Sequence, residues 1–142
     1  MNCSEVMTKD PACCLPSHTA FDAAQLMKTE DVGPIPIVSD EKIKTLAGIV
    51  TDRDVVLKVV AEGREPKATQ LKDVMTTDVV TCHPDDDVNN VLQLMEVHQV
   101  RRIPIVDDNN RLVGIIAQAD IATRVDEPAK THEVVEEISR AA

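Results

Sequence analysis

One stretch of the sequence combines side chains suited to holding a phosphate and a sugar. In Gly48-Ile49-Val50-Thr51-Asp52-Arg53-Asp54, a predicted strand runs directly into a predicted helix. The start of a helix presents unpaired backbone N–H groups, to which a phosphate can bind without a dedicated cation. The Thr51 hydroxyl can donate a hydrogen bond to a phosphate oxygen, and the Asp54 carboxylate can accept hydrogen bonds from a pair of ribose hydroxyls. The stretch is therefore a candidate site for a phosphate and a ribose.

The same two side chains also fit a role that needs no ligand. Thr-x-x-Asp matches a capping box, in which the two side chains satisfy N–H groups of the first helical turn. A second copy of the stretch, described below, has Ala117 and Asp120 at the corresponding positions. Ala117 cannot cap through its side chain, yet the carboxylate is kept, and the helix dipole favours it there by at most about 1 kcal/mol. Capping and ligand binding both stay open as interpretations of Asp54 and Asp120.

Two adjacent arginines form a second candidate for phosphate binding. Arg101-Arg102 directly precedes a predicted buried strand, Ile103–Val106. Arginines are most often solvated surface residues, but adjacent strand residues point to opposite faces, so one of the two must face the other way. On a chain with a net charge of −10, such a pair beside a helix start would attract phosphate. The other copy has Gly33-Pro34 at this place, so the attraction is one-sided.

The cysteines and histidines show no spacing typical of a zinc site, so we expect no structural metal. The four cysteines are Cys3, Cys13, Cys14 and Cys82. Either they are core thiols, or they form a redox sensor, which would require a lowered thiol pKa. The sequence contains no nucleophile elbow, Walker loop or G-x-G-x-x-G, and no assembled set of acid, base and nucleophile. We therefore expect that the protein is not an enzyme.

The composition argues against nucleic acid and membrane partners. The chain has 142 residues, with one Phe and no Trp or Tyr, so it lacks the stacking platforms of single-strand binders. Its 15 basic against 25 acidic residues give the wrong sign for binding a phosphate backbone. No apolar run approaches the length of a membrane-spanning helix, and the first residues do not resemble a signal peptide. We expect a soluble, cytoplasmic protein.

The candidate segments are positioned by an internal repeat. Val6-Met7-Thr8 recurs 68 positions later as Val74-Met75-Thr76, and Ile35-Pro36-Ile37-Val38 recurs as Ile103-Pro104-Ile105-Val106. Beyond a predicted turn the offset falls to 66, so that Gly48-Ile49 matches Gly114-Ile115 and Asp54 matches Asp120. The repeat predicts a first domain at 4–62, a linker at 63–70, a second domain at 71–126 and an amphipathic helical tail at 127–142.

Each copy predicts the order β-α-β-β-α. The first predicted strand is Ala12–Leu15 or Val79–His83, and Pro16-Ser17 or Pro84-Asp85 opens the first helix. The buried face of that helix is predicted from apolar spacing. It comprises Val88, Val91, Leu92 and Met95 in the second copy and Ala20, Ala23, Ala24 and Met27 in the first. Two central strands follow (35–38 and 46–50; 103–106 and 112–116), and then a second helix (52–61; 119–125).

The repeated unit, with Ile-Pro-Ile-Val on one central strand and Gly-Ile-Val-Thr-Asp-Arg-Asp at the end of the next, resembles a tandem pair of CBS domains over about residues 4–126. The Val97–Pro104 and Thr51–Lys58 segments are similar to those of small stand-alone bacterial CBS-pair proteins. The resemblance implies an α/β (α+β) fold in which two units, related by a pseudo-twofold axis, share one core. It also implies a non-catalytic sensor that binds an adenosine-containing nucleotide between the copies.

The resemblance implies two inequivalent binding sites. The first comprises Thr51, Arg53, Asp54, Thr76, Val80, Val100, Arg101 and Arg102. The second and weaker site comprises Thr8, Ala12, Val32, Gly33, Ala117 and Asp120. The expected ligand is AMP or ATP, with NAD and S-adenosylmethionine as further possibilities, and no cofactor is required. A homodimer and an unknown downstream protein are the expected partners. The alternative function is a redox or stress-response interaction module that acts through its cysteines with no nucleotide bound.

Overall fold

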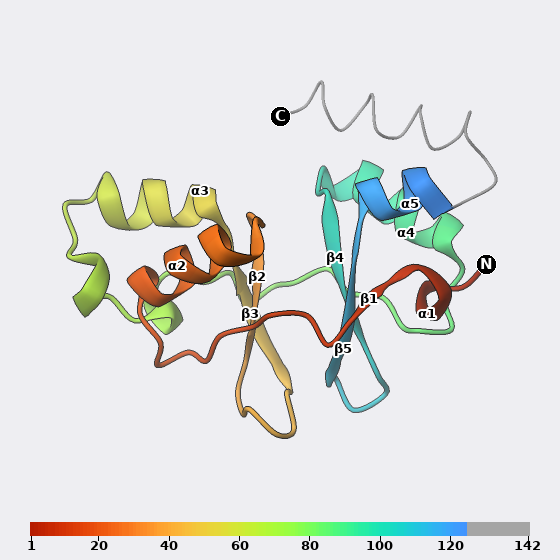
Figure 1. The fold of residues 1–142 in the computed structure, drawn as a ribbon, viewed down its shortest axis with the longest axis horizontal. Helices are drawn as coiled ribbons and strands as arrows, with labels where there is room; N and C mark the ends of the chain where they lie inside the picture. Colours follow the sequence, from red (N-terminus) through yellow and green to blue (C-terminus); the bar gives the residue numbers. More distant parts are fainter. Residues whose placement is uncertain (125–142) are drawn as a thin grey trace. The chain divides into compact units, whose positions relative to one another are not determined.

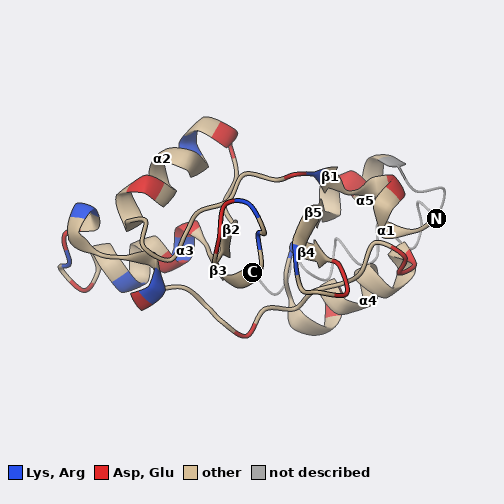
Figure 2. Ribbon diagram, turned by 90° about the horizontal axis from the view of Figure 1, so that it is seen from below, with Lys and Arg blue, Asp and Glu red and all other residues tan. Residues whose placement is uncertain are grey.

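The computed structural model describes residues 1–124, which fold into two compact units of mixed helices and strands (Figure 1). The middle unit comprises Ala12–Val79, and the terminal unit combines Met1–Pro11 with the chain from Val80 onward. The α+β fold class that the resemblance implied is confirmed. The helix expected at 127–142 lies outside the described residues. Basic and acidic residues are interspersed over both units (Figure 2).

The middle unit is built on an antiparallel hairpin. Its strands are β2 (Ile35–Val38) and β3 (Leu46–Val50), with Ile35 opposite Val50. All four residues of β2 are buried, as expected for an apolar run covered on both faces. The helices beside the hairpin are α2 (Ala20–Glu30), α3 (Asp52–Val55) and the π-helix η1 (Val56–Val60) (Figure 1). Two 3-10 helices, η2 (Pro66–Ala68) and η3 (Leu71–Asp73), precede the last residues of the unit.

The terminal unit repeats this plan with one more strand. Its three-stranded sheet has the order β1-β5-β4, formed by Thr8–Lys9, Leu112–Ala117 and Arg102–Val106, and both pairings are antiparallel. The helices are α1 (Cys3–Val6), α4 (Val88–His98) and α5 (Gln118–Arg124). The first residues of the chain therefore belong to the sheet that the second repeat forms, because β1 pairs with β5.

The predicted helix faces are largely confirmed. Val88, Val91, Leu92 and Met95 of α4 are all buried. In α2 the buried residues are Ala20, Ala23 and Met27, whereas Ala24 is partly exposed. The buried positions of α2 thus match those of α4, but its smaller side chains form a narrower buried face.

The predicted helix starts are wrong by about one turn. Pro16-Ser17 and Pro84-Asp85 form turns, and α2 and α4 begin three or four residues later. Thr19 caps α2 by accepting a hydrogen bond from the backbone N–H of Asp22. Asp87 caps α4 in the same way through the N–H of Asn89. A side-chain oxygen at the N-cap ends the turn and starts the helix more effectively than the proline before it.

The strands predicted at Ala12–Leu15 and Val79–His83 are reduced to single parallel bridges, Cys14 to Ile37 and Cys82 to Ile105. A proline follows each bridging cysteine by two residues, and its lack of an N–H group prevents a further ladder hydrogen bond. The helix predicted at 52–61 also differs from the prediction, because its geometry changes from α to π after Val55.

The buried side chains of the described residues form two clusters, one in each unit. Cys3 and Val6 from the first residues of the chain belong to the cluster of the terminal unit. Leu71 and Val74, from the start of the second repeat, belong to the cluster of the middle unit. Each unit completes its own core with a short segment of the other repeat. The compact units therefore divide the chain near 11 and 79, not at the repeat boundary.

Gly48 of β3 and Gly114 of β5 permit this exchange. A Cβ at Gly48 would lie 2.7 Å from the carbonyl oxygen of Thr76, and one at Gly114 would lie 3.0 Å from that of Thr8. These contacts involve backbone atoms, which cannot move aside without shifting the whole segment. Both strands therefore need glycine where the neighbouring segment passes.

We expect Gly48→Ala to lower the free energy of unfolding by about 1–3 kcal/mol, because the new methyl group must displace the Thr76 backbone. Gly33→Ala is the matched control and should lower the stability less. A Cβ at Gly33 would lie 3.2 Å from the exposed side chain of Asp52, which can move aside. Urea unfolding at neutral pH measures both variants. A Gly48→Ala protein as stable as the wild type would show that the segment is not held against β3.

Candidate ligand-binding site

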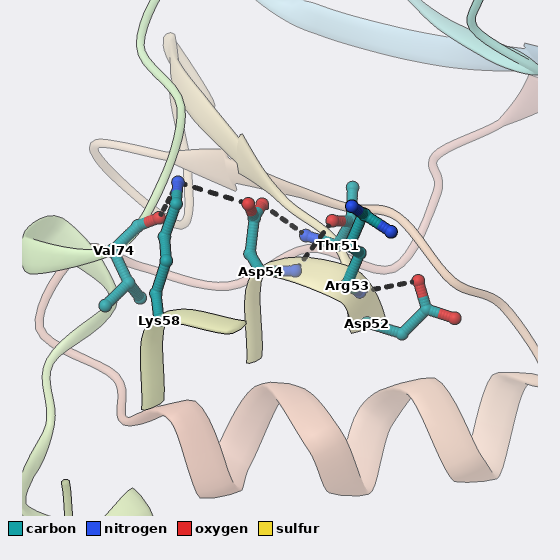
Figure 3. Close-up of polar contacts among 6 residues, drawn as sticks. All are labelled: Thr51, Asp52, Arg53, Asp54, Lys58 and Val74. Carbon is teal, nitrogen blue, oxygen red and sulfur yellow. Dashed lines mark hydrogen bonds and ion pairs between the residues drawn. The ribbon is translucent and has the colours of Figure 1, made fainter. Parts of the chain in front are cut away.

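The start of α3 is a capping box. Thr51 is the N-cap residue, and its Oγ1 accepts a hydrogen bond from the backbone N–H of Asp54 at 3.1 Å. In return, Asp54 Oδ2 accepts a hydrogen bond from the backbone N–H of Thr51 at 3.0 Å (Figure 3). The capping interpretation of this pair is thus confirmed. It leaves ligand binding possible, because neither side chain has used all of its hydrogen-bonding capacity.

A third residue, Lys58, completes this cluster. Its Nζ lies 3.1 Å from Asp54 Oδ1 and donates a hydrogen bond of 3.0 Å to the carbonyl oxygen of Val74 (Figure 3). The Asp54 side chain is 16% exposed and that of Lys58 is 46% exposed. Both carboxylate oxygens of Asp54 therefore have a partner, one on each side. Lys58 was not among the predicted site residues, although its spacing of four residues from Asp54 is typical of a helical ion pair.

Two further predicted site residues lie close to this cluster in the middle unit. Thr76 exchanges two backbone hydrogen bonds of 2.9 Å with Ile49 of β3, two residues before Thr51. The carbonyl oxygen of Gly33 accepts a hydrogen bond of 3.1 Å from the backbone N–H of Asp52. Gly33, predicted for the second site, thus borders the same helix start as Thr51. The remaining predicted residues of this unit are the exposed Arg53 and the partly buried Ala12 and Val32.

The terminal unit carries the counterpart of the helix start. Asp120 Oδ2 accepts a hydrogen bond of 3.2 Å from the backbone N–H of Ala117, so half of the capping box is kept. Arg102 lies opposite Ala117 in the sheet, and the carbonyl oxygen of Arg101 accepts a hydrogen bond from the N–H of Gln118 at 2.9 Å. Both arginines therefore adjoin the start of α5 in the terminal unit, whereas Thr51 and Asp54, with which they were predicted to form the first site, belong to the middle unit.

The other predicted residues of the terminal unit have backbone or packing roles. Thr8 pairs with Ile115 in the sheet. Val80 and Val100 are partly buried against the core cluster of the unit. Each unit thus contains residues predicted for both sites. The middle unit holds Thr51, Arg53, Asp54 and Thr76 together with Ala12, Val32 and Gly33. The terminal unit holds Val80, Val100, Arg101 and Arg102 together with Thr8, Ala117 and Asp120.

Three of the four cysteines do not have the environment of reactive thiols. Burial raises the pKa of Cys3 to about 12 and those of Cys14 and Cys82 to about 11. Since the thiolate is the nucleophilic form, these three side chains are poor redox sensors at neutral pH. Cys13 is only partly buried. All four cysteines lie within residues 1–124 and none forms a disulfide.

Within residues 1–124, no group of three or more His, Cys, Asp or Glu side chains is arranged to hold a metal ion. None of the helices in this part of the chain has the length and apolar character needed to cross a membrane.

Residues 3–61 and 71–127 each match the CBS domain family, so the match covers both copies of the repeat. The chain belongs to the CBS domain family. The CBS domain-containing protein YhcV of Bacillus subtilis (strain 168) is 43% identical over 118 residues, which span 83% of this chain and 81% of YhcV. The predicted resemblance to small bacterial CBS-pair proteins is confirmed.

Two solved CBS structures are similar in fold and sequence. The crystal structure of Hypoxic Response Protein I, with two coordinated zinc ions, has a TM-score of 0.80 and 33% identity, covering 88% of this chain and 99% of that one. The CBS domain pair of protein MJ0100 has a TM-score of 0.75 and 29% identity, covering 87% of this chain and 94% of that one. That pair was crystallised in complex with 5′-methylthioadenosine and S-adenosyl-L-methionine.

We expect Thr51→Ala to lower the free energy of unfolding by about 1 kcal/mol, because the backbone N–H of Asp54 loses its acceptor. Thr51→Ser keeps the hydroxyl and should stay near the wild type. Thr19→Ala at the equivalent capping box of α2 should cost a similar amount. Urea unfolding measures all three, and an unchanged midpoint for Thr51→Ala would contradict the capping role.

We expect iodoacetamide at mildly alkaline pH to alkylate Cys13 faster than the other three cysteines, because the buried thiols resist ionisation. Peptide mass mapping after timed quenching locates the modified residue, and the same reaction in urea, where all four should react, is the control. Rapid modification of Cys3, Cys14 or Cys82 in the folded protein would contradict their buried state and favour a redox function.

Proposed function

We propose that this chain is a non-catalytic regulatory module that binds an adenosine-containing nucleotide, with AMP or ATP as the preferred ligand. The observation that carries the proposal is the adenosine derivatives bound by the related CBS pair of MJ0100. This chain supplies a capped helix start after β3 in which a carboxylate is oriented from both sides. 5′-Methylthioadenosine and S-adenosylmethionine share an adenosine moiety with AMP and ATP, and a fixed carboxylate suits the two hydroxyls of its ribose.

Thr51 and Asp54 can bind such a ligand while they cap α3. The Thr51 oxygen accepts one hydrogen bond from Asp54, which leaves its O–H free to donate to a phosphate oxygen. The Asp54 carboxylate has about four acceptor positions, and two of these are occupied by the Thr51 N–H and by Lys58. Asp54 thus has acceptors left for ribose hydroxyls, and we assign it that role.

Arg101 and Arg102 are proposed to favour ligands that carry phosphate. Both adjoin the start of α5, and guanidinium groups bind phosphate oxygens in a bidentate manner. The complete first site, with Arg53, Thr76, Val80 and Val100 as its other members, stays a prediction from the resemblance. So does the second site around Asp120, whose helix start lacks the Thr51 hydroxyl.

The ligand can regulate the module if it binds two of its conformations with different affinities. The ratio of these affinities sets how far the ligand can shift the populations of the two conformations. We propose that the module works as a homodimer and transmits this shift to a downstream protein.

A thermal-shift series with AMP, ADP, ATP, NAD, S-adenosylmethionine and 5′-methylthioadenosine tests the proposal. A ligand at 100 times its dissociation constant should stabilise the fold by about 2.7 kcal/mol. We expect Asp54→Ala and the double variant Arg101→Ala/Arg102→Ala each to abolish the shift with AMP or ATP. Ala117→Thr, which restores a hydroxyl to the second helix start, should leave or strengthen it.

The matched control is Thr19→Ala/Asp22→Ala, which removes a capping box of the same type from α2 in the same unit. This variant should lose stability but keep its nucleotide shift. If no nucleotide raises the melting temperature while the mobility of the protein changes with oxidation, the proposal is wrong and the redox alternative is favoured.

A further inference from the structure

Lys58 connects three parts of the middle unit at the proposed ribose-binding carboxylate. It extends from the π-helix η1, contacts Asp54 on α3, and donates to the carbonyl oxygen of Val74 after η3 (Figure 3). Val74 itself is buried, so its backbone is a fixed anchor. An ammonium group that only neutralised a surface carboxylate would not need this second, backbone partner.

The geometry restrains the Asp54 carboxylate at both of its oxygens. The Thr51 N–H holds Oδ2 and Lys58 holds Oδ1. The terminal torsion of an Asp side chain is otherwise broad, so a single hydrogen bond would leave the carboxylate plane free to turn. Because both oxygens are held, the carboxylate plane cannot turn freely, and its remaining acceptor positions point in a fixed direction.

The repeat carries the same arrangement of residue types in the other copy. Arg124 lies four residues after Asp120, as Lys58 does after Asp54, and Val6 corresponds to Val74. A basic residue thus follows the carboxylate at the same spacing in both copies, although the neighbouring Thr51 is replaced by Ala117.

We propose that Lys58 is a positioning residue that makes the site selective for ribose over sugars without the 2′ and 3′ hydroxyls. It does so by holding Asp54 in the orientation that accepts hydrogen bonds from those hydroxyls. The inference rests on the proposed function, which assigns Asp54 to the ribose. Without Lys58, the ligand itself must order the carboxylate. The conformational entropy lost in this ordering weakens the hydrogen bonding of Asp54 to the ribose hydroxyls.

The test compares AMP with 2′,3′-dideoxy-AMP, measuring both dissociation constants by calorimetry for the wild type and for Lys58→Met. The two ligands have the same charge, so any general effect of the lost lysine charge cancels in the ratio of the constants. In the wild type the dideoxy ligand should bind roughly tenfold to a hundredfold more weakly, as expected for hydrogen bonds to a charged group. In Lys58→Met this ratio should fall to about threefold or less.

Two further variants separate positioning from folding and charge. Lys58→Arg keeps a cation that can reach both partners and should retain most of the wild-type ratio. Lys28→Met removes one positive charge from the exposed last turn of α2 and should leave the ratio unchanged. Urea unfolding confirms that each variant is folded at the temperature of the binding measurement.

Equal ratios in the wild type and Lys58→Met, with AMP bound by both, would overturn this inference and leave the proposed function standing. Failure of the wild type to bind AMP would overturn the inference. If the other adenosine ligands also fail to bind, the proposed function falls with it.

Discussion

The close approach of the segment Val74–Thr76 to Gly48 determines how the Asp54 carboxylate of the middle unit is held. Only hydrogen atoms fit on the Cα of Gly48, because a Cβ there would lie 2.7 Å from the Thr76 carbonyl oxygen. This approach lets Thr76 pair with Ile49 and brings the Val74 carbonyl within reach of Lys58. Lys58 then contacts Asp54, so the orientation of the carboxylate depends on a strand position that carries no side chain. Gly114 plays the corresponding part in the terminal unit, where Thr8 passes β5.

The sequence predicted the features that depend on periodicity and repetition. The two central strands of each copy and the buried face of α4 follow from apolar spacing, which reflects burial directly. It failed where a single polar contact decides the outcome. Thr19 and Asp87 start their helices after the predicted turn residues, because their side chains accept a backbone N–H. The strands before them stop at one bridge each, since the following proline cannot donate.

The candidate site was predictable in part for the same reason. Thr51 and Asp54 were predicted from the stretch where a strand runs into a helix, and Asp120 from the repeat of that stretch. The structure places all three at two helix starts. The link from Lys58 to Val74 joins residues 16 positions apart, and no local pattern reveals it. The capping box also shows that a structural role does not exclude a binding role. A capped helix start keeps Asp54 in place before any ligand arrives, so less conformational freedom remains to be lost on binding.

The exchange of segments between the two repeats bears on how such a chain can arise. The first residues of the chain complete the sheet and core of the terminal unit, while Leu71 and Val74 complete the core of the middle unit. A single repeat therefore ends with one strand edge and part of its core uncovered, and it needs the leading segment of another copy. The two copies in this chain thus supply each other with these segments at a fixed one-to-one ratio.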